Sequence, residues 1–161
     1  MKRVLLLIPI AALCAWGVVV WSYEPLLCNQ ELNSMRARTS ATGETVNDYR
    51  LALAVRDNLT RLRRLEGPCR TNPRVYMLEA QNQYLLGQKE ASIEAIRRAL
   101  AVDQRPEFYA AIGETLFELG RVDEAVDNYV IAARFNALVL DQIEAEQVKR
   151  KVLERMHRPA P

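Results

Sequence analysis

Few residues of this chain are suited to covalent or metal chemistry, which is limited to three cysteines and one histidine. Cys14 lies within an apolar stretch, where a thiol acts as a small hydrophobic side chain. Cys28 and Cys69 follow that stretch. They lie in the part of the chain that we expect outside the cytoplasm, because basic residues flank the apolar stretch closely only on its N-terminal side. Two cysteines in an oxidising compartment predict a structural disulfide, here closing a loop of about 42 residues. The alternative is a pair of unpaired buried thiols.

Metal binding and catalysis find little support. His157 and two cysteines are too few ligands for zinc, and no Cys-x-x-Cys pair is present. Glu114 and Glu118 are four residues apart and could present two acids on one helix face, but exposed pairs of this kind are ordinary helix surface. Gly-x-Ser-x-Gly, Walker-type and His-Glu-x-x-His motifs are also missing from the sequence. We therefore expect that the protein is not an enzyme and that it binds no metal, no cofactor and no small-molecule substrate.

Charge and composition divide the 161 residues into two parts. Residues 4–21 carry no charge, whereas the remaining chain holds the 22 Lys and Arg and the 20 Asp and Glu. Six Gly, seven Pro and 7% aromatic residues favour an all-α domain over an all-β or disordered chain. A net charge of +2 is too small to indicate a nucleic-acid-binding protein.

The apolar stretch at residues 4–21 predicts a single transmembrane helix. Its 18 residues would span roughly 27 Å, close to the hydrocarbon core of a bilayer. Lys2 and Arg3 precede it, and the next basic residue is Arg36. Aromatic residues that favour the membrane interface gather at its far end: Trp16, Trp21 and Tyr23. The positive-inside rule then predicts a single-pass protein of the bacterial inner membrane with a cytoplasmic N-terminus and a periplasmic C-terminal domain.

Two other interpretations of this stretch stay open. A cleaved signal peptide would be cut near residues 15–17 or 20–22, although neither has an Ala-x-Ala pattern. A lipoprotein signal would acylate Cys14, although bulky Leu13 precedes it. All three interpretations place the remaining chain outside the cytoplasm.

The charged part predicts helices throughout. One helix is expected near residues 29–39, and a capping box at Thr45 and Asp48 begins another that ends at Gly67-Pro68. Its apolar residues fall near one face: Val46, Tyr49, Leu53, Leu59, Leu62 and Leu65. A last unbroken helix is expected over 138–157, with a stripe of Leu140, Ile143, Val148, Val152 and Met156.

Between these helices the sequence repeats itself with a constant offset, the one that separates Pro73 from Pro106. The other matched positions are Tyr76 and Tyr109, Ala80 and Gly113, Gly87 and Gly120, Ser92 and Ala125, Ile96 and Tyr129, and Ala99 and Ala132. The small residues at these positions would permit close approach of paired helices. Gly87 and Gly120 would allow a tight turn between the two helices of each pair.

This pattern resembles the tetratricopeptide repeat (TPR) family. The residues that carry the resemblance best lie in the second copy: Tyr109, Ile112, Gly113, Leu116, Gly120, Ala125, Tyr129 and Ala132. The first copy departs from the family pattern at Glu79 and Gln83, where apolar residues are usual. After the second copy, Ala137 stands at the position where members of the family often have a proline that closes the repeat. The resemblance implies a helix-turn-helix solenoid.

The expected organisation has five parts. Residues 1–22 form the anchor or signal peptide, and 23–72 a linker and helical hairpin that is either a degenerate repeat or an unrelated element. Residues 73–105 form the first TPR, 106–136 the second, and 137–161 a capping helix and tail.

The resemblance also implies a concave groove that binds a protein segment. Position by position, its lining would be Arg74, Met77, Gln81, Tyr84, Ala110, Glu114, Phe117 and Glu118. The alternative for Tyr84 and Phe117 is packing against neighbouring helices. The Lys/Asn clamp of chaperone-binding TPR domains is missing at these positions.

We expect a membrane-anchored periplasmic protein that binds envelope or membrane proteins and scaffolds a complex. One alternative is an integral accessory subunit whose repeats are mainly structural. Another is an N-anchored TPR receptor that faces the cytosol.

Overall fold

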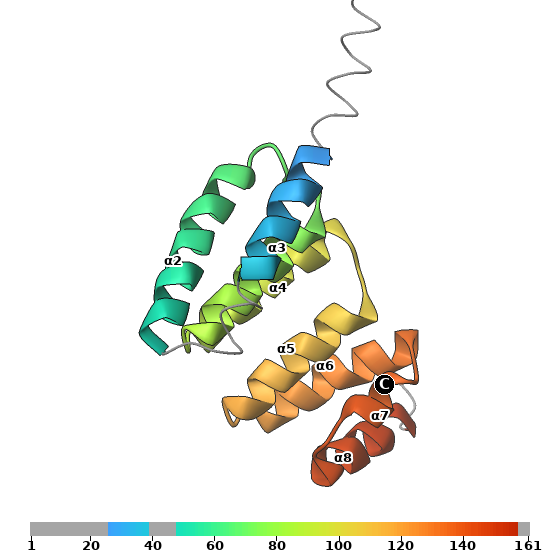
Figure 1. The fold of residues 1–161 in the computed structure, drawn as a ribbon. Coiled ribbons are helices and arrows are strands. Elements are labelled where there is room, and N and C mark those ends of the chain that lie inside the picture. Colours follow the sequence, from blue (N-terminus) through green and yellow to red (C-terminus); the bar gives the residue numbers. More distant parts are fainter. Residues whose placement is uncertain (1–25, 39–47, 158–161) are drawn as a thin grey trace, which may run out of the picture. The chain divides into compact units, whose positions relative to one another are not determined.

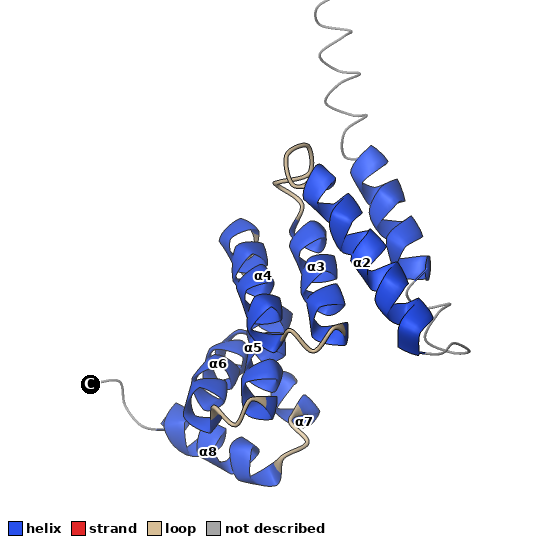
Figure 2. Cartoon of the chain, turned by 90° about the vertical axis from the view of Figure 1, so that its left-hand side faces the viewer, coloured by secondary structure: helices blue, strands red, loops and turns tan. Residues whose placement is uncertain are grey.

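The computed structural model describes residues 26–38 and 48–157, and the regular structure in this part of the chain is helical (Figures 1 and 2). None of these described helices is long and apolar enough to cross a bilayer. The predicted anchor at 4–21 and the cap at Thr45 lie outside the described residues. The chain divides into two compact units, Met1–Arg70 and Thr71–Pro161.

The first unit is a helical hairpin, formed by the helix over residues 26–38 and α2 (Asp48–Leu65). Leu32 and Met35 of the first helix are buried, as are Val55 and Leu62 of α2. The fully buried Asn58 donates a hydrogen bond from Nδ2 to the Met35 carbonyl at 3.4 Å, which ties α2 to the first helix.

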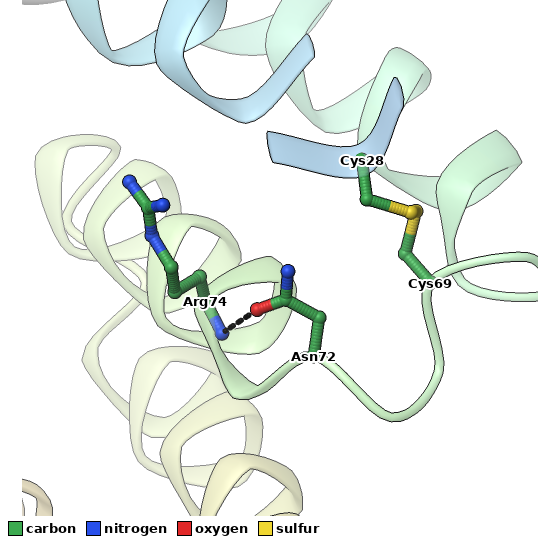
Figure 3. Close-up of a disulfide and its surroundings, with 4 residues drawn as sticks. All are labelled: Cys28, Cys69, Asn72 and Arg74. Carbon is green, nitrogen blue, oxygen red and sulfur yellow. Dashed lines mark hydrogen bonds between the residues drawn. A yellow bond between two sulfur atoms is a disulfide. The ribbon is translucent and has the colours of Figure 1, made fainter. Parts of the chain in front are cut away.

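A disulfide joins the start of this hairpin to the segment that follows α2 (Figure 3). Cys28 and Cys69 are both buried, and their Cα atoms lie 5.9 Å apart. The two cysteines are 41 positions apart in the sequence.

The predicted apolar face of α2 is wrong at two positions. Tyr49 and Leu53 are 73% and 59% exposed, whereas the buried side of α2 carries Val55, Asn58 and Leu62. Leu53 precedes Val55 by two residues, which places it about 200° around the helix. The polar Asn58 thus belongs to the buried face because it has a backbone partner, which hydrophobicity alone does not reveal.

The second unit begins with two antiparallel helix pairs (Figure 1). They are α3 (Pro73–Leu85) with α4 (Lys89–Val102), and α5 (Pro106–Glu118) with α6 (Val122–Phe135). Pro73 and Pro106 open α3 and α5, where the missing N–H costs no helical hydrogen bond. Asn72 caps α3, because its Oδ1 accepts a hydrogen bond from the Arg74 N–H at 3.1 Å (Figure 3).

The turns inside the two pairs have the same geometry. Gly87 and Gly120 have φ angles of +73° and +75°, which are strained for other residues. After α3, the Gln88 N–H donates to the Gln83 carbonyl at 2.9 Å, and after α5 the Arg121 N–H donates to Leu116 at 2.9 Å. Both turns are therefore Schellman motifs, and they lie at equivalent positions of the two copies.

The small residues at the matched repeat positions lie in the core of this unit. Ala80, Ser92, Ala99, Ala125 and Ala132 are all at most 2% exposed. A Cβ on Gly113 would meet the Tyr129 ring at 3.1 Å, so this glycine allows the ring to lie against α5.

Of the two polar departures in the first copy, Glu79 has a partner on α4, whereas Gln83 Oε1 is buried without a hydrogen-bond partner among the described residues. Glu79 Oε1 lies 2.7 Å from Arg98 Nη2 of α4, and the Arg98 guanidinium lies 5.3 Å from the centroid of the Tyr76 ring. An ion pair and a cation–π contact thus join α3 and α4 where other repeats use apolar packing.

The predicted unbroken helix at 138–157 is wrong. The structure has a short α7 (Val139–Gln142), three non-helical residues and then α8 (Glu146–His157). Ile143 is extended, with φ −79° and ψ 103°, and is 4% exposed. In an unbroken helix the step from Ile143 to Val148 would turn about 500°, which leaves Val148 roughly 140° off the stripe. The break brings both side chains into the core.

Helix α8 covers α6 and adds charged contacts to the apolar ones. Val148 and Val152 are at most 1% exposed. Lys151 Nζ lies 3.7 Å from Asp123 Oδ1, and Arg155 pairs with both Asp123 and Asp127. Cationic side chains of α8 therefore pair with acidic side chains of α6.

Candidate partner-binding groove

A pocket of about 330 Å³ opens within the second unit. One wall is α5, with Tyr129 of α6 behind it, and the other wall is the segment that joins α7 to α8. Its lining residues are Glu107, Ala110, Ala111, Glu114, Phe117, Glu118, Tyr129, Gln142, Ile143, Glu144, Ala145 and Val148. We call this site the α5 groove.

The sequence of α5 explains why one of its faces lines the groove. The α5 lining positions are spaced mainly by three or four residues, which places them along one side of a helix. The small Ala110 and Ala111 leave room above the helix, and Phe117 supplies an apolar surface. Glu107, Glu114 and Glu118 are exposed along the same side.

The structure brings together five of the eight predicted groove residues. Ala110, Glu114, Phe117 and Glu118 all line the α5 groove, and Tyr84 joins them through a hydrogen bond from its hydroxyl to Glu118 Oε1 at 2.6 Å. Phe117 is also partly buried against the hydrophobic core.

The other three predicted residues do not line the α5 groove. Arg74 and Gln81 are exposed on α3, and Met77 is partly buried against the hydrophobic core. The first copy therefore contributes no lining residue, and Tyr84 is linked to the groove only through its hydrogen bond to Glu118.

A small network orders the end of α5. Glu118 accepts from Tyr84, and its Oε2 lies 2.9 Å from Lys89 Nζ of α4. The hydrogen bond from Tyr84, followed by that from Lys89, lowers the pKa of the Glu118 carboxyl. The same bond, then burial and the charges of Glu118 and Glu114, raises the pKa of Tyr84 to about 12. Glu118 is thus anionic and Tyr84 is a neutral donor near pH 7.

Tyr129 lies between the groove and the core. Its side chain is 8% exposed and lines the pocket. Burial, then the negative charges of Glu114 and Glu118, raises the pKa of Tyr129 to about 12. The hydroxyl is therefore protonated near pH 7 and faces an anionic site.

Sequence reasoning missed several groove residues, and a signal existed for some of them. Glu107 occupies the position in the second copy that Arg74 occupies in the first, so the repeat offset identifies it as lining. The sequence predicts a continuous helix over Ile143, Glu144 and Ala145, and the irregular spacing from Ile143 to Val148 is the available sign of a break.

Within residues 26–38 and 48–157, no group of three or more His, Cys, Asp or Glu side chains is placed to hold a metal ion.

Comparison with known proteins identifies the repeat. Residues 73–105 match the tetratricopeptide repeat family. The fold is similar to the crystal structure of a thermophilic TPR protein from Thermus thermophilus, with a TM-score of 0.65 and 20% sequence identity. The alignment covers 76% of this chain and 62% of that protein, so the chain spans less than two thirds of its length. A search of curated proteins gave no match.

These findings agree with the internal evidence. The matched segment contains α3 and α4, and the pair α5 and α6 repeats its proline start and its Schellman turn at equivalent positions. The chain therefore contains a tetratricopeptide repeat at residues 73–105 and has the all-helical fold of a TPR-like solenoid.

Proposed function

We propose that this chain is a membrane-anchored periplasmic TPR protein that binds other proteins and helps to scaffold an envelope complex. The observation that carries the proposal is the α5 groove, where the four predicted contact residues of the second repeat line one pocket. An apolar floor with charged edges suits the burial of a protein segment.

The location rests on two features of the sequence and one of the structure. Residues 4–21 are apolar, and basic residues precede them closely but follow them only at a distance. The pairing of Cys28 with Cys69 fits an oxidising compartment such as the periplasm. Tethering would raise the effective concentration of the groove near membrane partners.

Photo-crosslinking in intact membranes tests the binding function. A photoreactive phenylalanine analogue is placed at Ala110 or Glu114 in the groove, or at the control Glu154, which is exposed on α8 outside the lining. We expect discrete crosslinks to an envelope protein from the two groove positions and none from Glu154. Equal labelling from all three positions, or none from the groove, would contradict the proposal.

Location is tested separately in cells. We expect the C-terminal domain to be digested by protease in spheroplasts but protected in intact cells, and Cys28 and Cys69 to resist alkylation until a reductant is added. Thiols that are alkylated in intact cells without reductant would overturn the periplasmic assignment.

Replacement of residues 4–21 by an unrelated membrane helix separates a tether from an accessory subunit. If these residues are only a tether, crosslinking from Glu114 is retained after the exchange. Its loss would favour a subunit whose transmembrane helix itself packs into a larger complex.

A further inference from the structure

The charge of the α5 groove differs from that of the rest of the second unit. Four carboxylates line it, namely Glu107, Glu114, Glu118 and Glu144, and no Lys or Arg does. Glu118 is paired with Lys89 at 2.9 Å. The other three have no ion-pair partner among the described residues.

Most acidic residues elsewhere in this unit have an ion-pair partner, and the exceptions among the described residues are Glu90, Glu146 and Glu154. Glu79 forms an ion pair with Arg98, and Glu124 forms one with Arg121. Asp123 and Asp127 of α6 both pair with Arg155 of α8. Most acids of this unit thus lie next to a cationic side chain, whereas three of the four groove carboxylates do not. Their joint field attracts cations and repels an acidic partner.

A second, independent observation points to a ligand in the same place. Tyr129 lines the groove and is 8% exposed, yet its hydroxyl makes no hydrogen bond within the described part of the chain. The hydroxyl oxygen is not one of the fully buried side-chain atoms that lack a partner, so it is accessible from the pocket that Tyr129 lines. The hydroxyl is thus a donor and acceptor that a bound segment can satisfy.

The size and floor of the groove define what enters it. A volume of about 330 Å³ is at the lower end for ligand pockets, which suits one or two side chains better than a whole helix. Phe117, Ile143 and Val148 offer apolar contacts at the floor. The carboxylates stand on both walls, since Glu107 and Glu114 come from α5 and Glu144 from the opposite segment.

We infer that the α5 groove binds a basic segment of the protein partner. An apolar side chain of the segment packs on Phe117 and Val148, neighbouring Lys or Arg side chains pair with Glu107, Glu114 and Glu144, and a polar group of the segment hydrogen-bonds the Tyr129 hydroxyl. This inference rests on the proposed protein-binding function and specifies the chemistry of the partner.

The test uses the full-length chain in uncharged detergent and labelled 12-residue peptides. Two peptide sets have the same apolar residues, but one carries four Lys or Arg and the other four Glu. We expect the basic set to bind by fluorescence anisotropy, more weakly at 300 than at 50 mM NaCl because salt screens exposed pairs. The acidic set should not bind.

Two matched triple variants locate the effect. Glu107→Gln/Glu114→Gln/Glu144→Gln should weaken binding of the basic set about tenfold, since each exposed ion pair contributes modestly. The control, Glu31→Gln/Glu90→Gln/Glu154→Gln, makes the same charge change at exposed positions outside the groove and should bind as the parent does. Equal losses in both variants would show a general charge effect and overturn the inference.

Tyr129→Phe separates binding from folding. Because the hydroxyl has no hydrogen-bond partner among the described residues, its removal should leave the thermal midpoint unchanged or raised while lowering peptide affinity several-fold. Unchanged affinity would contradict the role of Tyr129.

Different experimental results would overturn this inference and the proposed function. Preference for the acidic set, or no binding of either set, overturns the basic-segment inference. Crosslinks from Ala110 and Glu114 in membranes would still support the binding function in that case. Absence of those crosslinks would overturn the proposed function itself.

Discussion

Gly113 and Tyr129 form a matched pair of small and large residues at the contact between α5 and α6. The Tyr129 ring lies where a Cβ of residue 113 would be only 3.1 Å from it. The same ring closes the inner side of the α5 groove. Packing of the core and the shape of the candidate binding site therefore depend on one contact.

Enlarging Gly113 should disturb that contact. Gly113→Leu would push its side chain into the Tyr129 ring, and we expect the free energy of unfolding to fall by about 1–3 kcal/mol, as is typical of overpacked cores. In a Tyr129→Ala background the space is open, so the same substitution should cost less. Urea denaturation of the two single variants and the double variant measures this coupling. Additive effects would show that the two residues do not interact.

The bond between Tyr84 and Glu118 predicts a pH effect. Because Tyr84 lowers the pKa of Glu118, the bond contributes stability above the unfolded-state pKa of about 4.3 and loses it as the pH falls through the folded-state pKa. Tyr84→Phe should raise the pKa of Glu118 and lower stability at pH 7 by at most ~1 kcal/mol, since both groups are partly exposed.

Carboxyl NMR titration and urea denaturation at several pH values check this expectation. The stability difference between the parent and Tyr84→Phe should shrink toward zero in acid. Tyr49→Phe, which changes a tyrosine that is 73% exposed in the other unit, serves as the control. A difference that persists at low pH would point to lost packing instead of the carboxylate bond.

The helices of the repeat could be predicted from the sequence. The faces and ends of the helices outside the repeat were harder to predict. The constant offset predicts α3 to α6, because matched prolines begin the first helix of each pair and matched glycines follow it at positive φ. Outside the repeat no second copy exists for comparison. On α2 the apolar Leu53 is exposed and the polar Asn58 is buried, because long-range partners decide which face packs.

The same reasoning applies to the groove. Its α5 wall could be predicted from family resemblance, since each position maps to a fixed place in the repeat. Its opposite wall could not, because it depends on where the chain leaves α7 and on how α8 returns to α6. Ile143 is apolar and buried, as it would be on the apolar stripe of an unbroken helix, so its hydrophobicity did not reveal the break.

Helix α8 should act as a cap that protects α6. Val152 is fully buried in the core cluster, whereas its neighbour Leu153 is 38% exposed. Val152→Asp would place an unpaired charge in that core and cost about 3 kcal/mol or more, so we expect α8 to detach. Leu153→Asp should cost far less. Hydrogen exchange of α6 measures the result: faster exchange is expected for Val152→Asp alone, and equal rates would contradict a capping role.

The two compact units differ in how they are stabilised. The second unit has a continuous core that runs from Ala80 on α3 to Val152 on α8. The first has two described helices, few buried apolar residues among them and a disulfide at its base. Small units with limited cores commonly depend on covalent links.

Loss of the disulfide should therefore destabilise the first unit selectively. Cysteines 41 positions apart close a loop whose restriction of the unfolded chain is worth ~4 kcal/mol. Cys28→Ser/Cys69→Ser should abolish hydrogen-exchange protection of α2, while α4 to α6 keep theirs because their core lies in the other unit. Cys14→Ser should change neither. Protection lost in both units would show that they fold as one cooperative body, and protection kept in α2 would show that the hairpin is stable without its covalent link.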